Sequence, residues 1–250
     1  MHTFVREDSI VRRIWGQTDT VLFIFAGASA EFALNKAVDW LYFTGKLPAD
    51  PLGRLLSTVA YAKKIVFTST EEANRSIDVL RQIHSAVEAN RGATIPDWAY
   101  RDVLFMLIHY SIASFELLER KLTANEKQEV FDVFYRVGSR MGLQKLPTSY
   151  PEWLRARDAH LKEDLQRSKY THHLFRQYRA HLGWLRYLAL IEAQKLLVPS
   201  HVKMLLGFKD FSLLTFILPV YKFLRQLKMD KIIRQLLLPA GYEKQLAQTN

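Results

Sequence analysis

Three polar side chains stand out because their types and spacing could do chemistry. Arg54 and Thr58 lie four residues apart, just after Asp50-Pro51, and His84 follows 26 residues beyond Thr58. On a helix, residues four apart project from adjacent turns of one face, so Arg54 and Thr58 would form a polar unit. A guanidinium and a hydroxyl can together stabilise negative charge that develops on oxygen. The alternative is an Arg54 paired with a carboxylate such as Asp50, and a Thr58 packed by its methyl group.

His84 shares a helix face with three apolar residues, Ile77, Leu80 and Val87, and this spacing predicts that its side chain is buried. A neutral imidazole in such a place can bind iron through one ring nitrogen while the other hydrogen-bonds a neighbour, as the axial histidine of b-type haem does. A histidine on an apolar helix face is, however, more often a hydrogen-bonded core residue. The spacing alone leaves both interpretations open.

A second histidine, His109, stands within the apolar run Phe105 to Tyr110. It is the second candidate for an iron ligand. The role that we favour is a pocket histidine whose N–H fixes a neighbouring group. A hydrogen-bonded core histidine is an equally open alternative.

The elements that must position these residues are predicted to be helices. Apolar residues recur at helical spacing along almost the whole chain, without the sustained alternation of a half-buried strand. N-capping residues, glycines and prolines mark several helix ends. Predicted helices run from Ser69 or Thr70 to Gly92, from Pro96 to about Lys121, from Thr123 to Gly142, from Pro151 to about Ser168 and from about His172 to Leu197, followed by shorter pieces punctuated by Pro199, Pro219 and Pro239.

The composition is that of a soluble globular protein, with 250 residues of which 49% are hydrophobic. The absence of cysteine excludes disulfides, thiolate-ligated haem, covalently attached haem and cysteine zinc sites. The longest apolar runs, 21–30 and 213–221, are shorter than the roughly 18 to 20 residues that span a bilayer. The first residues do not resemble a signal peptide. We therefore expect a cytoplasmic protein, with peripheral membrane contact as a further option.

The net charge of +10 is concentrated in the last third of the chain. Residues 1–164 carry 21 acidic and 21 basic residues, whereas residues 165–250 carry 4 acidic and 14 basic ones. Such a basic region favours anionic lipid, nucleic acid or an acidic partner, unless it only forms the solvated faces of helices. No nucleic-acid motif accompanies it, so we expect no nucleic-acid partner.

Several short motifs occur in a characteristic order between about residues 20 and 155. In that order and spacing they resemble the haem-binding superfamily that contains latex clearing protein and the MpaB-type oxygenase of mycophenolic acid biosynthesis. The motifs are Phe25-Ala26-Gly27, Asp50-Pro51-x-x-Arg54-x-x-x-Thr58, Glu71-Glu72-Ala73, Ile83-His84-x-x-Val87, Ile108-His109 and Leu122-Thr123-x-x-Glu126.

The resemblance implies an all-α, single-domain helical bundle with a globin-like core and one haem b. It implies His84 as the axial ligand, and Arg54 and Thr58 in the pocket. In latex clearing proteins the activity is oxidative cleavage of isoprenoid double bonds by dioxygen. We therefore expect residues 1–250 to form one domain, with a haem pocket in about 20–155 and a basic helical part in about 165–250.

Two departures from latex clearing proteins affect the expected chemistry. Those proteins carry a lysine directly before the threonine, where this chain has Ser57, so the iron would lack that cap. They also use an upstream glutamate as a candidate base. Here Glu31, Asn35 and Asp39 form a stripe at spacings of four, so Glu31 or Asp39 could face the pocket; the stripe is otherwise the polar face of its helix.

Three functions fit these features. The first is a haem-dependent oxygenase that uses dioxygen on an apolar, isoprenoid- or lipid-like substrate. The second is a non-enzymatic protein that binds haem or a diatomic gas. The third is a haem-free helical protein that docks on anionic membranes through about residues 172–244. The polar pair Arg54 and Thr58 favours the oxygenase.

Overall fold

The regular structure is helical throughout the part of the chain that the computed structural model describes, residues 2–45 and 49–226. Two isolated bridges, between Thr3 and Ser69 and between Asn35 and Leu165, are its only β-type pairings there. The all-α prediction is confirmed. The helices are α1 (Ile10–Trp15), α2 (Thr18–Phe32), α3 (Asp39–Phe43), α5 (Pro51–Phe67), α6 (Thr70–Arg91), α7 (Asp97–Leu118), α8 (Ala124–Met141), α9 (Tyr150–Glu163), α10 (Lys169–Leu197), α11 (Ser200–Leu206) and α12 (Leu214–Gln226).

Most helix boundaries lie where the capping signals predict them. The Ser69 hydroxyl accepts a hydrogen bond from the N–H of Glu72 and so caps α6 at its first turn. Gly92 ends α6 with φ 68°, a left-handed conformation that glycine adopts without steric cost. Thr123 and Glu126 form the expected capping box of α8. These local signals therefore fix both ends of the helix that carries His84.

Other boundaries differ from the prediction. Helix α7 ends at Leu118, three residues before Lys121. Pro219 lies inside α12 instead of separating two helices. Pro239 lies outside the described residues.

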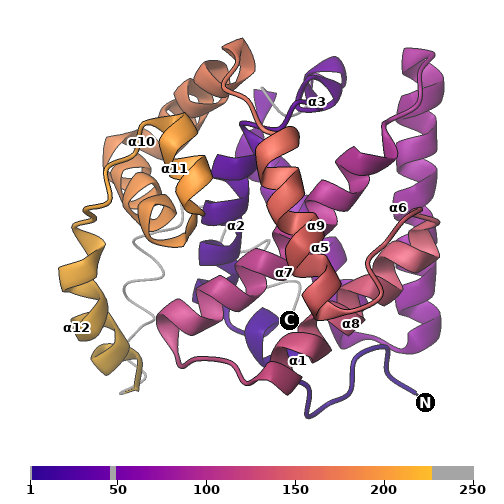
Figure 1. Ribbon diagram of the computed structural model, residues 1–250, viewed down its shortest axis with the longest axis horizontal. Helices are drawn as coiled ribbons and strands as arrows, with labels where there is room; N and C mark the ends of the chain where they lie inside the picture. The colour runs from indigo at the N-terminus through magenta and orange to yellow at the C-terminus, as the bar shows by residue number, and fades with distance from the viewer. Residues whose placement is uncertain (1, 46–48, 227–250) are drawn as a thin grey trace.

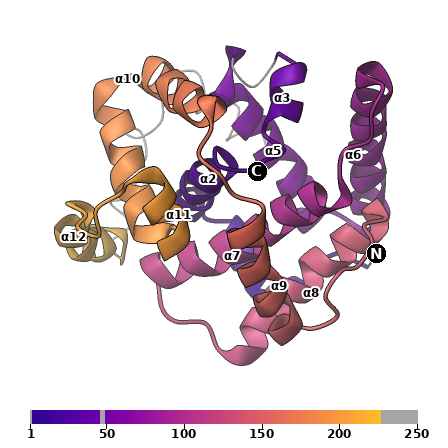
Figure 2. The same cartoon turned by 45° about the horizontal axis from the view of Figure 1, so that its top comes forward.

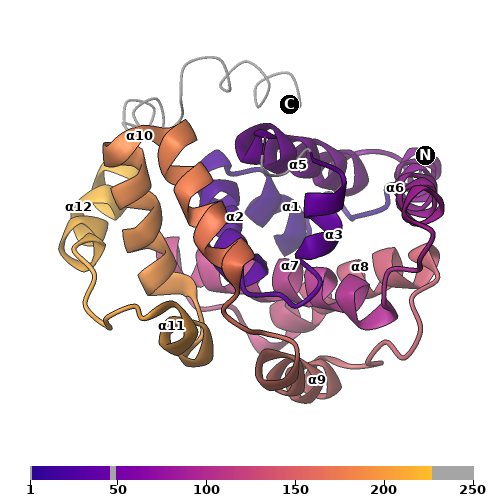
Figure 3. The ribbon, with the colours of Figure 1, turned by 90° about the horizontal axis from the view of Figure 1, so that it is seen from above.

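Helices α2 and α7 form the centre of the molecule, as Figure 1 shows, with α6 on one side and α10, α11 and α12 on the other. They approach closely at Gly27, where a Cβ atom would stand 2.3 Å from the ring of Tyr110. The rotated views keep α6 and α12 at opposite sides of this pair (Figures 2 and 3). The central pair thus forms a scaffold between two helical walls.

The main hydrophobic core runs from the N-terminal segment to α11. It includes Trp15, Tyr110, Phe115 and Trp153, none of which is more than 1% exposed. A smaller cluster joins the end of α2 to the first half of α10 through Ala33, Val38, Leu174 and Tyr178. Burial of this apolar surface is the main stabilisation of the fold.

No helix among the described residues has both the length and the apolar character needed to cross a bilayer.

Candidate functional site

A cavity of about 720 Å³ lies between the central helices and both walls. Side chains from α2, α5, α6, α7, α8, α10 and α12 line it, and most of them are apolar. Arg54, Thr58 and His84 all lie on its surface, together with Ser57. The structure therefore brings the three residues with candidate chemistry to one apolar cavity.

The wall of this cavity is not confined to residues 20–155. Tyr178, Arg186 and Leu190 of α10 and Tyr221 of α12 also line it. The basic C-terminal part of the chain is thus part of the cavity as well as of the outer surface.

His84 is half-buried at the α6 side of the cavity, with its ring edge-on to Tyr100 at a centroid distance of 5.1 Å. Its buried Nδ1 has no hydrogen-bond partner among the described residues. Burial, and then the nearby Arg54 guanidinium, lower the pKa of His84 from its usual value. The imidazole is therefore neutral at pH 7, the form that binds a metal.

Arg54 belongs to the first turns of α5, which Pro51 starts and Asp50 caps. The Asp50 carboxylate accepts a hydrogen bond of 2.8 Å from the N–H of Gly53. Burial lowers the pKa of the Arg54 guanidinium from its usual value. The side chain lines the cavity and presents a partly desolvated positive charge to it.

The hydroxyls of Ser57 and Thr58 donate hydrogen bonds to the backbone carbonyl of Arg54, at 2.8 and 3.1 Å. Both residues line the cavity. A hydroxyl that donates to the preceding turn still has acceptor lone pairs, and its hydrogen can be redirected by rotation about χ1. Thr58 can therefore either accept from or donate to a bound group.

His109, on α7, is half-buried and is not among the residues that line the cavity. Burial, and then the nearby Arg157 guanidinium, lower the pKa of His109 to about 4. Its buried Nε2 has no partner among the described residues. The histidine is thus a neutral residue beside a cluster of charged groups.

That cluster centres on a buried ion pair between Glu31 of α2 and Arg157 of α9. The guanidinium binds both carboxylate oxygens, and the hydroxyl of Tyr110 donates to one of them at 2.8 Å. Burial alone would raise the pKa of Glu31, but the charge and hydrogen bonds of Arg157 outweigh it and hold the pKa well below its usual value. Glu31 is therefore an ionised partner of Arg157.

The cluster continues through His160. Its Nδ1 hydrogen-bonds the carboxylates of Asp102 and Asp164, and Asn35 donates to the second oxygen of Asp102 at 2.8 Å. Burial lowers the pKa of His160, but its hydrogen bond to Asp102 and the nearby carboxylate of Glu31 outweigh this effect and raise the pKa to about 9. Ligand atoms of Asp102, His160 and Asp164 lie within 4.8 Å of one another, a geometry that could hold a metal ion. The raised pKa keeps His160 protonated at pH 7, whereas a histidine binds a metal in its neutral form.

The stripe of Glu31, Asn35 and Asp39 is therefore not one solvent-facing helix surface. Glu31 and Asn35 are buried, whereas Asp39 starts α3 and pairs with Arg91 at 2.6 Å. The guanidinium of Arg91 also lies 3.9 Å above the ring of Trp40, which lines the cavity. Asn35 lines the cavity too, but the carboxylates of Glu31 and Asp39 are not among its lining groups.

Of the residues that the sequence singled out, Arg54, Thr58 and His84 line the cavity and His109 does not, and most of the charged cluster was not predicted. The spacing of Glu31, Asn35 and Asp39 at intervals of four residues was the only sequence pattern that pointed to members of the cluster, namely Glu31 and Asn35. No comparable pattern marks Arg157 or His160, which come from a helix more than 120 residues further along the chain.

The fold and the cavity define an all-α protein with an apolar cavity whose lining includes a neutral histidine and an arginine. Residues 12–228 match the sequence model of a family described as "ER-bound oxygenase mpaB/B'/Rubber oxygenase, catalytic domain". The match spans most of the chain, so the chain belongs to this family, and the resemblance drawn from the motifs is confirmed. Residues 12–228 thus form an oxygenase-type catalytic domain.

Comparisons with curated proteins and with solved structures gave no match. The globin-like core that the resemblance implies therefore stays a prediction.

Proposed function

We propose that the protein is a haem b-dependent oxygenase that uses dioxygen on an apolar, isoprenoid- or lipid-like substrate. The observation that carries this proposal is the neutral His84 with an unpartnered ring nitrogen, on an apolar cavity that also holds Arg54 and Thr58. Membership of an oxygenase family supports dioxygen and an organic compound as reactants.

The residues around the cavity fit a haem. A buried imidazole nitrogen without a partner costs free energy unless a ligand satisfies it. The volume of about 720 Å³ lies within the range of cofactor and ligand pockets. Among the described lining residues the charged side chains include Arg54 and Arg186 and no carboxylate, so the propionates of a haem would meet positive charge.

His84 is the residue that would hold the iron, and the haem would supply the activation of dioxygen. The protein's own contribution is electrostatic and steric. Arg54, partly desolvated, is placed to stabilise negative charge on oxygen more strongly than it could in water. Thr58 can add a hydrogen bond from the next turn of the same helix. The apolar walls exclude water from the reacting groups.

The part of the cavity toward α12 is the proposed place of the substrate. Leu190 of α10 and Leu214 and Leu218 of α12 line the cavity there, and Tyr178, Arg186 and Tyr221 are the polar or charged residues that these two helices add to the lining. Such a lining favours long apolar chains over charged metabolites. It agrees with an isoprenoid or other lipid-like compound.

The test is to purify the protein from haem-supplemented cells, to record its absorption spectrum and to measure oxygen uptake with a panel of isoprenoids and unsaturated lipids. We expect a Soret band and oxygen uptake matched by an oxidised product. A Soret band without product from any member would favour the non-enzymatic haem- or gas-binding alternative. A colourless protein that takes up no added haem would overturn the proposal.

A further inference from the structure

Helix α12 presents an apolar face to the outside of the molecule. Phe216, Val220 and Phe223 are 68%, 59% and 60% exposed, and Leu213 and Ile217 are more than half exposed. These positions recur at spacings of three and four, so they form one continuous stripe on the helix. The exposed ring of Phe211 lies 5.9 Å from that of Phe216 and extends the stripe. An exposed apolar patch of this kind marks an interaction site.

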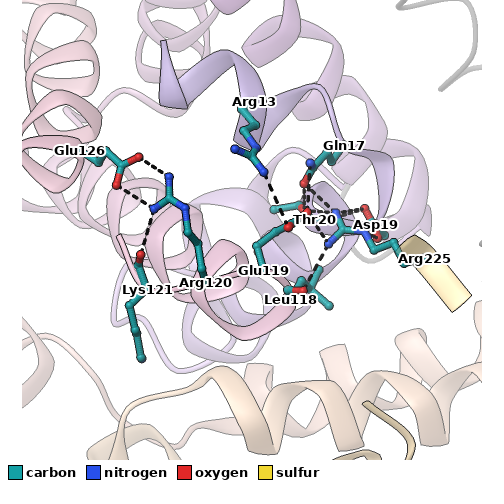
Figure 4. A network of polar contacts seen from close by, with 10 residues as sticks. All are labelled: Arg13, Gln17, Asp19, Thr20, Leu118, Glu119, Arg120, Lys121, Glu126 and Arg225. Carbon is teal, nitrogen blue, oxygen red and sulfur yellow. Dashed lines mark hydrogen bonds and ion pairs between the residues drawn. The ribbon is translucent and has the colours of Figure 1, made fainter. Parts of the chain in front are cut away.

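The orientation of α12 is fixed at both ends. Before the helix, the carboxylate of Glu192 accepts a hydrogen bond of 2.6 Å from the N–H of Leu213. Near its end, Tyr221 donates to buried Asp19 at 2.6 Å, and the Arg225 guanidinium contacts Asp19 and Glu119. Figure 4 shows Arg225 within this network, which also includes Gln17, Thr20 and the Leu118 carbonyl. The apolar stripe cannot turn inward without breaking these buried contacts.

The same helix forms a wall of the cavity. Leu214, Leu218 and Tyr221 line the cavity from the inner face of α12, and Ile217 both lines it and is 56% exposed. One helix therefore separates the apolar cavity from the apolar outer surface. This continuity connects the exposed stripe with the compound that the cavity receives.

The charge around the stripe is predominantly positive. Residues 200–226, which hold α11, α12 and the loop between them, carry four basic residues and one acidic residue, Asp210. Lys203 pairs with Asp210, and Arg225 pairs with Asp19 and Glu119. The other two basic residues are Lys209, in the loop, and Lys222, on α12. Apolar side chains at a surface with excess positive charge are the composition that binds anionic lipid bilayers.

We propose that α12 docks on the surface of an anionic lipid bilayer, with Phe216, Val220 and Phe223 in the boundary between headgroups and acyl chains. A bilayer accounts for the apolar stripe, the surrounding positive charge and the position on the cavity wall together. If two copies of the chain met through this stripe, their positively charged surfaces would repel each other, which disfavours self-association. An apolar substrate would then pass from the bilayer into the cavity beside α12, a step that rests on the proposed function, whereas the docking does not.

Two matched substitutions test the docking. Val220→Asp places a charge on the stripe, and Val79→Asp makes the same change at an exposed position of α6 on the opposite side of the molecule (Figure 1). The full chain is centrifuged with vesicles of neutral phosphatidylcholine and with vesicles that also contain phosphatidylserine. We expect binding that rises with phosphatidylserine and falls with salt, a loss of at least tenfold in Val220→Asp and no change in Val79→Asp.

Equal binding of both variants, or no binding of the unchanged protein, would overturn the docking. So would a stable dimer in solution that Val220→Asp converts to a monomer, because the stripe would then be an interface between copies. Vesicle binding requires no haem and no turnover. A protein that binds vesicles but not haem would therefore overturn the proposed function and leave the docking in place.

A second measurement locates the contact. The chain has no cysteine, so a thiol introduced as Phe216→Cys or Val79→Cys can be labelled at one position with an environment-sensitive fluorophore. We expect vesicles to shift the emission of the label at 216 to the blue, and spin-labelled lipid to quench it, while the label at 79 stays unchanged. A label at 216 that is already shielded before vesicles are added would contradict the proposal, because residues 227–250 or a second copy would then cover the stripe.

Discussion

Arg54 is the residue on which turnover should depend most. Its guanidinium lies on a largely apolar wall and close enough to His84 to lower the pKa of that imidazole. We expect Arg54→Ala to retain haem and to lower turnover by about 10² to 10³, the usual effect of removing one group that stabilises charge on oxygen. Absorption spectra and product formation on the same samples measure the two effects separately. Arg75→Ala, at an exposed position of α6, is the control, and full activity of Arg54→Ala would refute the role.

The ion pair of Glu31 with Arg157 should be a requirement for stability. Both side chains are almost fully buried, so removal of one partner leaves an uncompensated charge in the interior. We expect Arg157→Met to lower the free energy of unfolding by about 3 to 5 kcal/mol, and the double variant with Glu31→Gln to lower it less. Urea unfolding measures both, with the exposed Arg155→Met as control. A cost of Arg157→Met no larger than that of the control would contradict this account.

His160 should make stability depend on pH in the alkaline range. Its folded-state pKa of about 9 exceeds the ordinary value of 6.5, so the folded protein holds a proton that the unfolded chain releases. The stabilisation is complete below about pH 6.5 and is lost as the pH rises through about 9. We expect a decline on the order of 3 kcal/mol over this range, and its absence in His160→Gln. An identical pH profile in both proteins would show that His160 is not charged in the folded state.

Local spacing predicted that Arg54 and Thr58 share one helix face, but only the family resemblance predicted that they meet His84, which lies on the next helix, in one pocket. Local spacing could not predict the pairing of Glu31 with Arg157, which are 126 residues apart. Such a pair depends on how α9 packs across α2, and no local pattern encodes that packing.

At the scale of the helices, capping residues predicted well where helices begin and end. Interruptions within a helix were predicted poorly. Ser69, Thr123 and Gly142 act within one turn, so their effect is visible in the sequence. Proline usually ends a helix, yet Pro219 lies inside α12. Glu192 binds the backbone just before this helix, and Arg225 binds Asp19 from its last turn. Gly183 bends α10 with φ 72° and ψ 170°, a conformation that glycine can adopt. The neighbouring residues do not predict this bend.

The contact between α2 and α7 should be sensitive to a single methyl group. A Cβ at position 27 would stand 2.3 Å from the ring of Tyr110, which is itself held by Glu31. We therefore expect Gly27→Ala to destabilise the fold by about 1 to 3 kcal/mol, although alanine favours helices. Thermal unfolding at fixed protein concentration measures the change. A variant as stable as the unchanged protein would show that α2 and α7 can separate at no cost.

At the scale of the whole molecule, the cavity joins elements that the sequence analysis treated as separate parts. The wall near His84 comes from α6 and α7, and the wall near Ile217 comes from α12, on the opposite side in Figures 1 to 3. One space can therefore serve a cofactor at one end and an apolar substrate at the other. The positive charge in the last third of the chain predicted a basic outer surface for that part. It did not predict that the same part lines the cavity, because that depends on how α10 packs against α2 and α12 against α10.

The most direct test of the central claim is the absorption spectrum of the haem-supplemented protein beside those of His84→Ala and His109→Ala. Both histidines are neutral and each has a ring nitrogen without a partner among the described residues, but His84 alone of the two lines the cavity. The account predicts a Soret band in the unchanged protein and in His109→Ala, and its loss in His84→Ala. A Soret band that survives in His84→Ala and disappears in His109→Ala would contradict it.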